Sequence, residues 1–320
     1  MKHICLYFQV HQPRRLARFE VFDIGTDRPV FDDSLNIDVL HRVCDRGYIP
    51  ANALLLKLIR RFRGQFKAAF SLSGTVLEQM EAFHPSALYS FQELVGTGCI
   101  EILGETYYHS LSSVFDPAIF QKEVARHRAA VLKHFGQIPQ TFRNTESIYR
   151  DALWEDLFPL GFQACITEGV DGLLEGMSVH QVFESQHSSR NSILLRDYAR
   201  SDDVAFRFTD EEWEHFPLGI QTFQEWIEAS EGEVVNIFMD YETLGEHQGI
   251  QTGIFAFLEE WISYCLKEKR ATFFTPAEII QHHPIRSTFS TTDWISWADT
   301  ERDLSAWYGN EMQRERWKIY

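Results

Sequence analysis

An almost unbroken apolar run over residues 234–239 ends abruptly in polar residues, and this feature constrains the fold more than any other. The run reads Val-Val-Asn-Ile-Phe-Met and is followed by Asp240, Glu242, Glu246 and His247. A short run rich in β-branched residues predicts a strand buried on both faces, as in a parallel sheet. Acids at the carboxyl end of such a strand are the arrangement from which α/β barrels build their active sites.

The same pattern recurs along the chain. Strand-like runs over residues 3–10, 99–103 and 140–144 lead to His11, to Glu105 and His109, and to Glu146, the last of these runs being a weak one. Helical patterns separate these runs, and such alternation predicts parallel βαβ units, of which we count roughly seven. The GxGxxG and GxxxxGK(S/T) loops of nucleotide-binding sheets are absent from the sequence. We therefore expect an α/β protein with a closed barrel rather than an open nucleotide-binding sheet.

Charge and cysteine content limit the partners and the compartment. The sequence has 46 acidic against 30 basic residues, a formal net charge of −16, which disfavours nucleic acid and anionic membranes as partners. Its five cysteines are scattered and odd in number, so we expect buried free thiols in a reducing compartment. No apolar stretch approaches the roughly 20 residues that span a bilayer. We expect a cytoplasmic protein that is a monomer or a small homo-oligomer.

Two strand-end carboxylates, Glu146 and Asp240, are the candidate catalytic residues. Glycoside hydrolysis needs two facing acids, one ionised and one held protonated to assist the leaving oxygen. The alternative is that each acid is solvated or forms an ion pair, which is the commoner role of a lone strand-end acid.

His11 and His109 also follow strands. Neutral imidazoles hydrogen-bond sugar hydroxyls and ligate metals equally well, so both roles stay open at this point. The Trp-rich tail, with Trp294, Trp297 and Trp307, is suited either to stacking on sugar faces or to fixing a C-terminal helix to the barrel.

Five segments resemble a known family. HQP lies at 11–13, GCIEILGETYYH at 98–109, RNTESIY at 143–149, MDYETLGEHQ at 239–248 and ERDLSAW at 301–307. Together, and in this order, they resemble glycoside hydrolase family 57, specifically its short archaeal-type α-amylase-like branch. A departure from the family pattern is that Glu146 follows Arg-Asn-Thr, where many members have a Trp-rich stretch.

The resemblance implies a distorted (β/α)7 barrel over residues 1–285, with a helical extension over residues 286–320 packed on it. It implies a retaining mechanism on α-1,4-glucans or maltooligosaccharides, without a metal or organic cofactor. Glu146 would be the nucleophile and Asp240 the general acid/base. The residues expected to bind substrate are His11, Gln12, His109, Glu242, His247, Asp303 and Trp307.

Three other functions remain open on the sequence. A 4-α-glucanotransferase would share the covalent intermediate and pass it to a sugar hydroxyl. A catalytically weak glucan-binding protein would bind oligosaccharide without turnover. A metal-dependent polysaccharide deacetylase would hold a metal ion near His11.

The retaining mechanism makes a geometric prediction. Retention of the anomeric configuration requires the carboxyl groups of Glu146 and Asp240 to lie about 5–5.5 Å apart.

Overall fold

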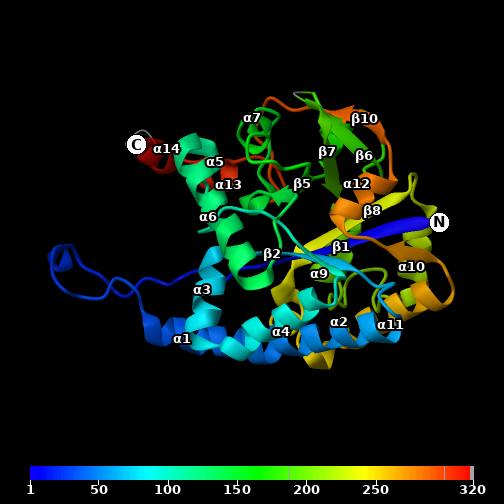
Figure 1. Ribbon diagram of the computed structural model, residues 1–320, viewed down its shortest axis with the longest axis horizontal. Coiled ribbons are helices and arrows are strands. Elements are labelled where there is room, and N and C mark those ends of the chain that lie inside the picture. Colours follow the sequence, from blue (N-terminus) through cyan, green and yellow to red (C-terminus); the bar gives the residue numbers. More distant parts are fainter. Residues whose placement is uncertain (187, 299, 318–320) are drawn as a thin grey trace.

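The fold is built on two sheets. The computed structural model describes residues 1–186, 188–298 and 300–317 (Figure 1). The first sheet has the order β3-β2-β1-β8, with β9 paired to the amino end of β1. The second has the order β10-β6-β7-β5-β4, and its β6–β7 pair is antiparallel while the other pairs in both sheets are parallel. The strands are β1 (Lys2–Val10), β2 (Ala68–Leu72), β3 (Ile100–Ile102), β4 (Thr141–Arg143), β5 (Ala164–Glu168), β6 (Val182–Ser185), β7 (Ser188–Arg196), β8 (Val234–Asp240), β9 (Ala271–Phe273) and β10 (Ile285–Phe289).

A few backbone hydrogen bonds connect the two sheets into a ring. On one side, the Gly104 amide donates to the Thr141 carbonyl and the Arg143 amide donates to the Gly104 carbonyl, each at 2.8 Å. On the other side, the Asp197 amide donates to the Asn236 carbonyl at 2.9 Å. Strands β1, β2, β3, β4, β5, β7 and β8 therefore follow one another around the ring. No regular ladder closes either seam between described residues, so the seven-stranded barrel predicted from the sequence is distorted.

Helices follow most strands and cover the outside. In Figure 1, α1, α2, α4 and α11 form a layer below the first sheet, and α6 stands at its left end. The helices between strands are α1 (Asp33–Val43), α2 (Ile49–Arg61), α3 (Gly74–Phe83), α4 (Pro85–Gly96), α5 (Ser112–Phe115), α6 (Pro117–Phe135), α7 (Leu153–Leu157), α8 (Asp171–Leu174), α9 (Tyr198–Ala205), α10 (Ile220–Ala229), α11 (Ile254–Lys267) and α12 (Pro276–His282).

Sequence signals place some helix ends accurately. The Asp116 side chain accepts hydrogen bonds from the amides of Ala118 and Ile119, and Pro117 occupies the first turn of α6. Gly136 ends that helix with a left-handed φ of 69°. Thr275 and Glu278 form a capping box at the start of α12. These ends depend on neighbouring residues, which is why local sequence predicts them.

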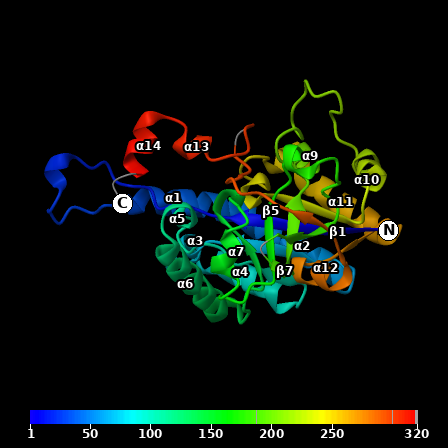
Figure 2. The same ribbon diagram turned by 90° about the horizontal axis from the view of Figure 1, so that it is seen from above.

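Residues 14–32 project from the body as an extended arm, far left in Figures 1 and 2. The bridge between Leu16 and Phe31 makes its base a short antiparallel pair. The arm leaves β1 directly after Gln12 and returns to α1.

The C-terminal residues return to the barrel. Strand β10 pairs with β6, and the Ile295 backbone pairs with Tyr149 just beyond β4. Helices α13 (Ser305–Tyr308) and α14 (Glu311–Trp317) follow. Figures 1 and 2 both place these helices at the end of the molecule toward which β1 runs.

All five cysteines are buried and free, as the sequence predicts. In the described part of the chain, no helix combines the length and apolar character that crossing a membrane requires.

Candidate active site

Glu146 lies in the 3-10 turn η3 (Thr145–Ser147) just beyond β4, in a left-handed conformation with φ 54° and ψ 25°. Non-glycine residues rarely adopt this conformation unless their surroundings hold them there. The Glu146 carbonyl accepts from the Trp297 amide at 3.2 Å and from Ser296 Oγ at 2.9 Å. The C-terminal segment therefore fixes the turn that carries this acid.

Both carboxylate oxygens of Glu146 have a donor. His109 Nε2 lies 3.1 Å from Oε1, and Trp297 Nε1 donates to Oε2 at 2.8 Å. Burial alone would raise the pKa of Glu146. The hydrogen bond and charge of His109, the Arg143 charge and the Trp297 hydrogen bond outweigh burial and lower the pKa to about 2. Glu146 is therefore ionised and oriented at neutral pH.

His109 connects two carboxylates. Its Nδ1 lies 3.2 Å from Glu105 Oε2, while its Nε2 faces Glu146. Burial would lower the pKa of His109, but the hydrogen bonds to Glu105 and Glu146 raise it to about 9. A protonated imidazole donates from both nitrogens, so His109 acts here as a charged double donor.

His11 differs sharply from His109. The two rings stack with centroids 4.2 Å apart and planes 21° apart. Burial, then the His109 charge, lowers the pKa of His11 to about 3. His11 Nδ1 lies 2.7 Å from Ser73 Oγ. The pair therefore presents one neutral and one charged imidazole.

Asp240 ends β8 and is paired in register with Gln9 of β1. Burial and the Glu146 charge raise its pKa, against the opposing effect of Arg143. The Arg143 guanidinium is fully buried, donates to Gln9 Oε1 and lies 4.7 Å from the centroid of the Phe238 ring. Its charge acts on both acids, lowering the pKa of each.

Glu242 follows Asp240 in the 3-10 turn η4 (Tyr241–Thr243) and is buried. Its Oε1 accepts from Gln12 Nε2 at 3.2 Å and from the Tyr48 hydroxyl. Burial and the Asp240 charge raise the pKa of Glu242 to about 7. Gln12 and Glu242, predicted separately, therefore form one hydrogen-bonded pair.

The other three predicted residues are placed less centrally. His247 is exposed, but it is close enough to Asp240 to lower the pKa of that acid. Asp303 is exposed and accepts the Ser305 amide at 2.7 Å, which fixes the start of α13. Trp307 is half-buried on α13. Between described side chains, no hydrogen bond joins Asp303 or Trp307 to Glu146.

Three residues of this cluster were not selected from the sequence. Glu105 stood out only as a strand-end acid, and Arg143 only as part of a family segment. For Trp297 the sequence indicates either stacking on a sugar or fixing of a C-terminal helix. Instead its ring stacks on Phe238 at 4.8 Å while its N–H holds Glu146. Arg143 ends the short strand β4, whose sequence is Thr-Phe-Arg, and nothing in that local sequence indicates that its charge is buried.

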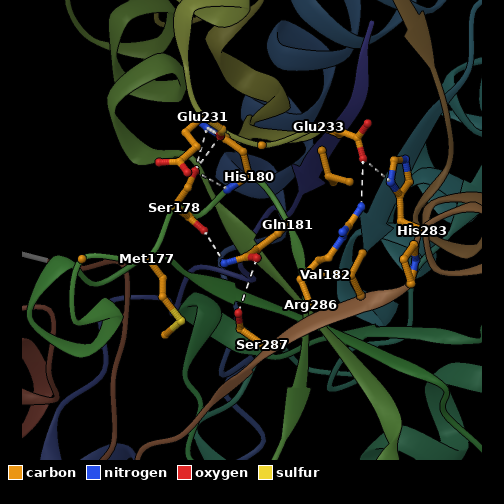
Figure 3. A pocket seen from close by; sticks show the side chains of 14 residues that line it. Met177, Ser178, His180, Gln181, Val182, Glu231, Glu233, His283, Arg286 and Ser287 are labelled. Carbon is orange, nitrogen blue, oxygen red and sulfur yellow. Dashed lines mark hydrogen bonds and ion pairs between the residues drawn. The ribbon is translucent and has the colours of Figure 1, made fainter.

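A polar cavity of about 510 Å³ lies elsewhere (Figure 3). Glu233 and Val234 line it together with Ser178, His180 and Arg286, and Figure 3 shows Glu233 facing Arg286 and His283. Val234 begins β8 and Asp240 ends it. The cavity and Asp240 therefore lie at opposite ends of about 20 Å of extended strand. The cavity is therefore not part of the Glu146 cluster.

Comparisons with known proteins point to one family. A family model described as glycosyl hydrolase family 57 matches residues 5–293. A protein of Methanocaldococcus jannaschii named "Putative alpha-amylase" is 38% identical over 316 residues, which cover 97% of this chain and 67% of the relative.

Solved structures show the same fold at low identity. A family 57-type branching enzyme from Pyrococcus horikoshii superposes with a TM-score of 0.74 at 12% identity, covering 99% of this chain and 77% of that one. The 4-α-glucanotransferase from Thermococcus litoralis gives 0.71 at 17% identity, covering 93% of this chain but only 43% of its own.

Proposed function

Because the chain belongs to glycosyl hydrolase family 57, we propose that it is a retaining, α-amylase-like enzyme that cleaves α-1,4-glucans through a covalent glycosyl-enzyme intermediate. The observation that carries the proposal is that the pKa values of two acids are shifted in opposite directions. Hydrogen bonds and charge keep Glu146 ionised, whereas burial and the Glu146 charge raise the pKa of Asp240. A nucleophile and a general acid need these opposite states.

In the proposed first step, the Glu146 carboxylate attacks the anomeric carbon while protonated Asp240 gives its proton to the departing glycosidic oxygen. In the second step, Asp240 takes a proton from water, which attacks the anomeric carbon and releases Glu146. His109 and Trp297 hold the two oxygens of Glu146 in place for the attack. We expect a carboxyl separation of about 5–5.5 Å in the productive state.

The remaining predicted residues would hold the sugar. His11 is neutral and can donate to or accept from sugar hydroxyls. Both N–H groups of the protonated His109 face Glu105 and Glu146, and we assign His109 to substrate binding because it lies in a segment that matches the family. We assign Gln12, Glu242, His247, Asp303 and Trp307 to substrate binding because they lie in segments that match the family. The acidic surface favours a neutral polysaccharide over nucleic acid, and we assign the enzyme to the cytoplasm.

A 4-α-glucanotransferase is the second candidate, supported by the similarity to the Thermococcus litoralis enzyme of that name. Transfer and hydrolysis proceed through the same intermediate. They differ only in whether a sugar hydroxyl or water attacks it.

Product analysis with maltoheptaose separates these functions, with Glu146→Gln as the control variant. Shorter products alone support hydrolysis, and longer products as well support transfer. Retained turnover in Glu146→Gln would reassign the nucleophile. Binding without turnover by the wild type would favour a glucan-binding protein. Acetate release from N-acetylated oligosaccharides that EDTA abolishes would favour a deacetylase.

Proton NMR of the first-formed products tests the stereochemistry. A retaining enzyme releases the α-anomer initially, and initial release of the β-anomer would exclude the covalent intermediate.

A further inference from the structure

Three potential metal ligands meet away from the Glu146 cluster. His41, Asp45 and His84 each offer one ligand atom, and these atoms lie within 4.8 Å of one another. They form the one such group among the residues that the structure describes. We propose that this group binds one divalent transition-metal ion of the zinc class.

Two helical elements supply the ligands. His41 lies in the last turn of α1, and Asp45 lies four residues later in the π-helical turn η2 (Cys44–Tyr48), which continues α1. Positions i and i+4 face the same side of a helix, and π turns frequently mark functional sites. His84 is the residue that precedes α4. An ion here would therefore join α1 and η2 to the start of α4.

The spacing suits a zinc ion. Two ligands that each lie about 2.0–2.1 Å from a tetrahedral zinc ion are about 3.3 Å apart. His84 Nε2 and Asp45 Oδ1 are 3.1 Å apart, and the rings of His41 and His84 have centroids 4.8 Å apart. His41 and Asp45 are exposed. Rotation of exposed side chains can therefore close the remaining gap.

The outer hydrogen bonds resemble those of metal sites, where a histidine's second nitrogen is held by another group. His41 Nε2 lies 2.9 Å from the Phe83 carbonyl, which can only accept, so this nitrogen carries the proton and Nδ1 keeps its lone pair. His84 Nδ1 lies 3.1 Å from Ser86 Oγ, while its Nε2 faces Asp45.

The donor types set the class of ion. Two imidazoles and one carboxylate suit zinc and its neighbours, whereas magnesium and calcium prefer all-oxygen sites. The formal net charge of −16 also favours cation binding. The competing explanation is an ordinary ion pair of His84 with Asp45. That explanation gives His41 no part, so variants of His41 distinguish the two.

The location points to a role in stability. Tyr48 at the end of η2 donates to Glu242, and Gly47 packs against the Leu244 carbonyl with no room for a side chain. An ion at Asp45 would fasten this turn to α4 and so support the loop that follows Asp240. We expect zinc to raise the melting temperature of the full-length protein.

The test is titration of the EDTA-treated, dialysed full-length protein with zinc chloride by calorimetry. The variants are Asp45→Asn and His41→Gln. The control is Glu214→Gln, which removes the acid of another exposed His–acid pair, His215 with Glu214 at 3.3 Å. We expect one equivalent bound by wild type and control, and at least about tenfold weaker binding by each ligand variant, since even outer-shell changes cost 10–100-fold. Zinc should raise the melting temperature of wild type and control only, and magnesium should not replace it.

Cobalt(II) supplies an independent readout, because its visible absorption reports the ligand geometry. We expect a band in the wild type that the His41→Gln variant loses. The proposal is overturned if the wild type binds no stoichiometric zinc, or if His41→Gln binds zinc as tightly as wild type. The second result would mean an ion pair with adventitious surface binding only. Neither readout depends on glucan turnover.

Discussion

Trp297 donates its indole N–H to Oε2 of Glu146 at 2.8 Å, across 151 residues of sequence. The same tryptophan stacks on Phe238, two residues before Asp240. One ring from the C-terminal segment therefore contacts both the proposed nucleophile and the strand that carries the proposed acid/base. This makes the C-terminal segment part of the site rather than an accessory to it.

Replacing Trp297 with Phe should separate these two contacts. The phenyl ring keeps the stacking on Phe238 but cannot donate to Glu146, so the carboxylate loses orientation and its pKa rises. We expect kcat to fall by up to about 10²-fold, as for small misplacements of reacting groups, and the acid limb of the pH–activity profile to move to higher pH. Kinetics over a pH series and the melting temperature measure both effects. An unchanged acid limb with a lower melting temperature would mean that Trp297 is only structural.

The charge of His109 predicts how stability depends on pH. Its pKa is about 9 in the folded protein against 6.5 ordinarily, so its contribution is complete below about 6.5 and is lost as pH rises through about 9. The melting temperature of the wild type should fall across this interval, and that of His109→Asn should fall less. Asn also tolerates the left-handed backbone at this position, with φ 54°. The exposed His282→Asn variant is the control and should follow the wild type. Parallel slopes for wild type and His109→Asn would contradict this assignment.

The sequence predicts the strand ends well and the contacts between them poorly. Strand-like runs that end at His11, Glu146 and Asp240 are local signals, and parallel strands bring their carboxyl ends to one side of a barrel. The family segments likewise locate the histidines. Neither the stacking of His11 on His109 nor the buried charge of Arg143 leaves a local signal, because each depends on the distance between strands that are remote in sequence. The contact between Trp297 and Glu146 depends on where the C-terminal segment runs, and only the folded structure shows this.

Glu242 should set the position of the alkaline limb of the pH–activity profile. The Asp240 charge raises the pKa of Glu242, and by reciprocity a charged Glu242 raises the pKa of Asp240. Glu242→Gln removes that charge, so the pKa of Asp240 falls and the alkaline limb of kcat/KM should move to lower pH. The control is Glu246→Gln, which removes another acid of the same loop, one that forms an ion pair with Arg42 at 2.7 Å. That variant should not move the limb to lower pH. An alkaline limb in Glu242→Gln that coincides with wild type would show that Asp240 is not the group titrating there.

Gly245, in the loop after Asp240, should tolerate no side chain. Its φ is 104°, and a Cβ atom there would overlap the Arg46 carbonyl oxygen in η2. We expect Gly245→Ala to lower the free energy of unfolding by at least about 1–3 kcal/mol, from backbone strain and the displaced turn. Because the displacement reaches Tyr48 and through it Glu242, kcat should fall as well. Gly172→Ala is the matched control, since a Cβ at Gly172 meets nothing within 4 Å and the residue lies in α8. Denaturant unfolding of both variants measures the difference, and equal stabilities would show that the contact between η2 and this loop relaxes without cost.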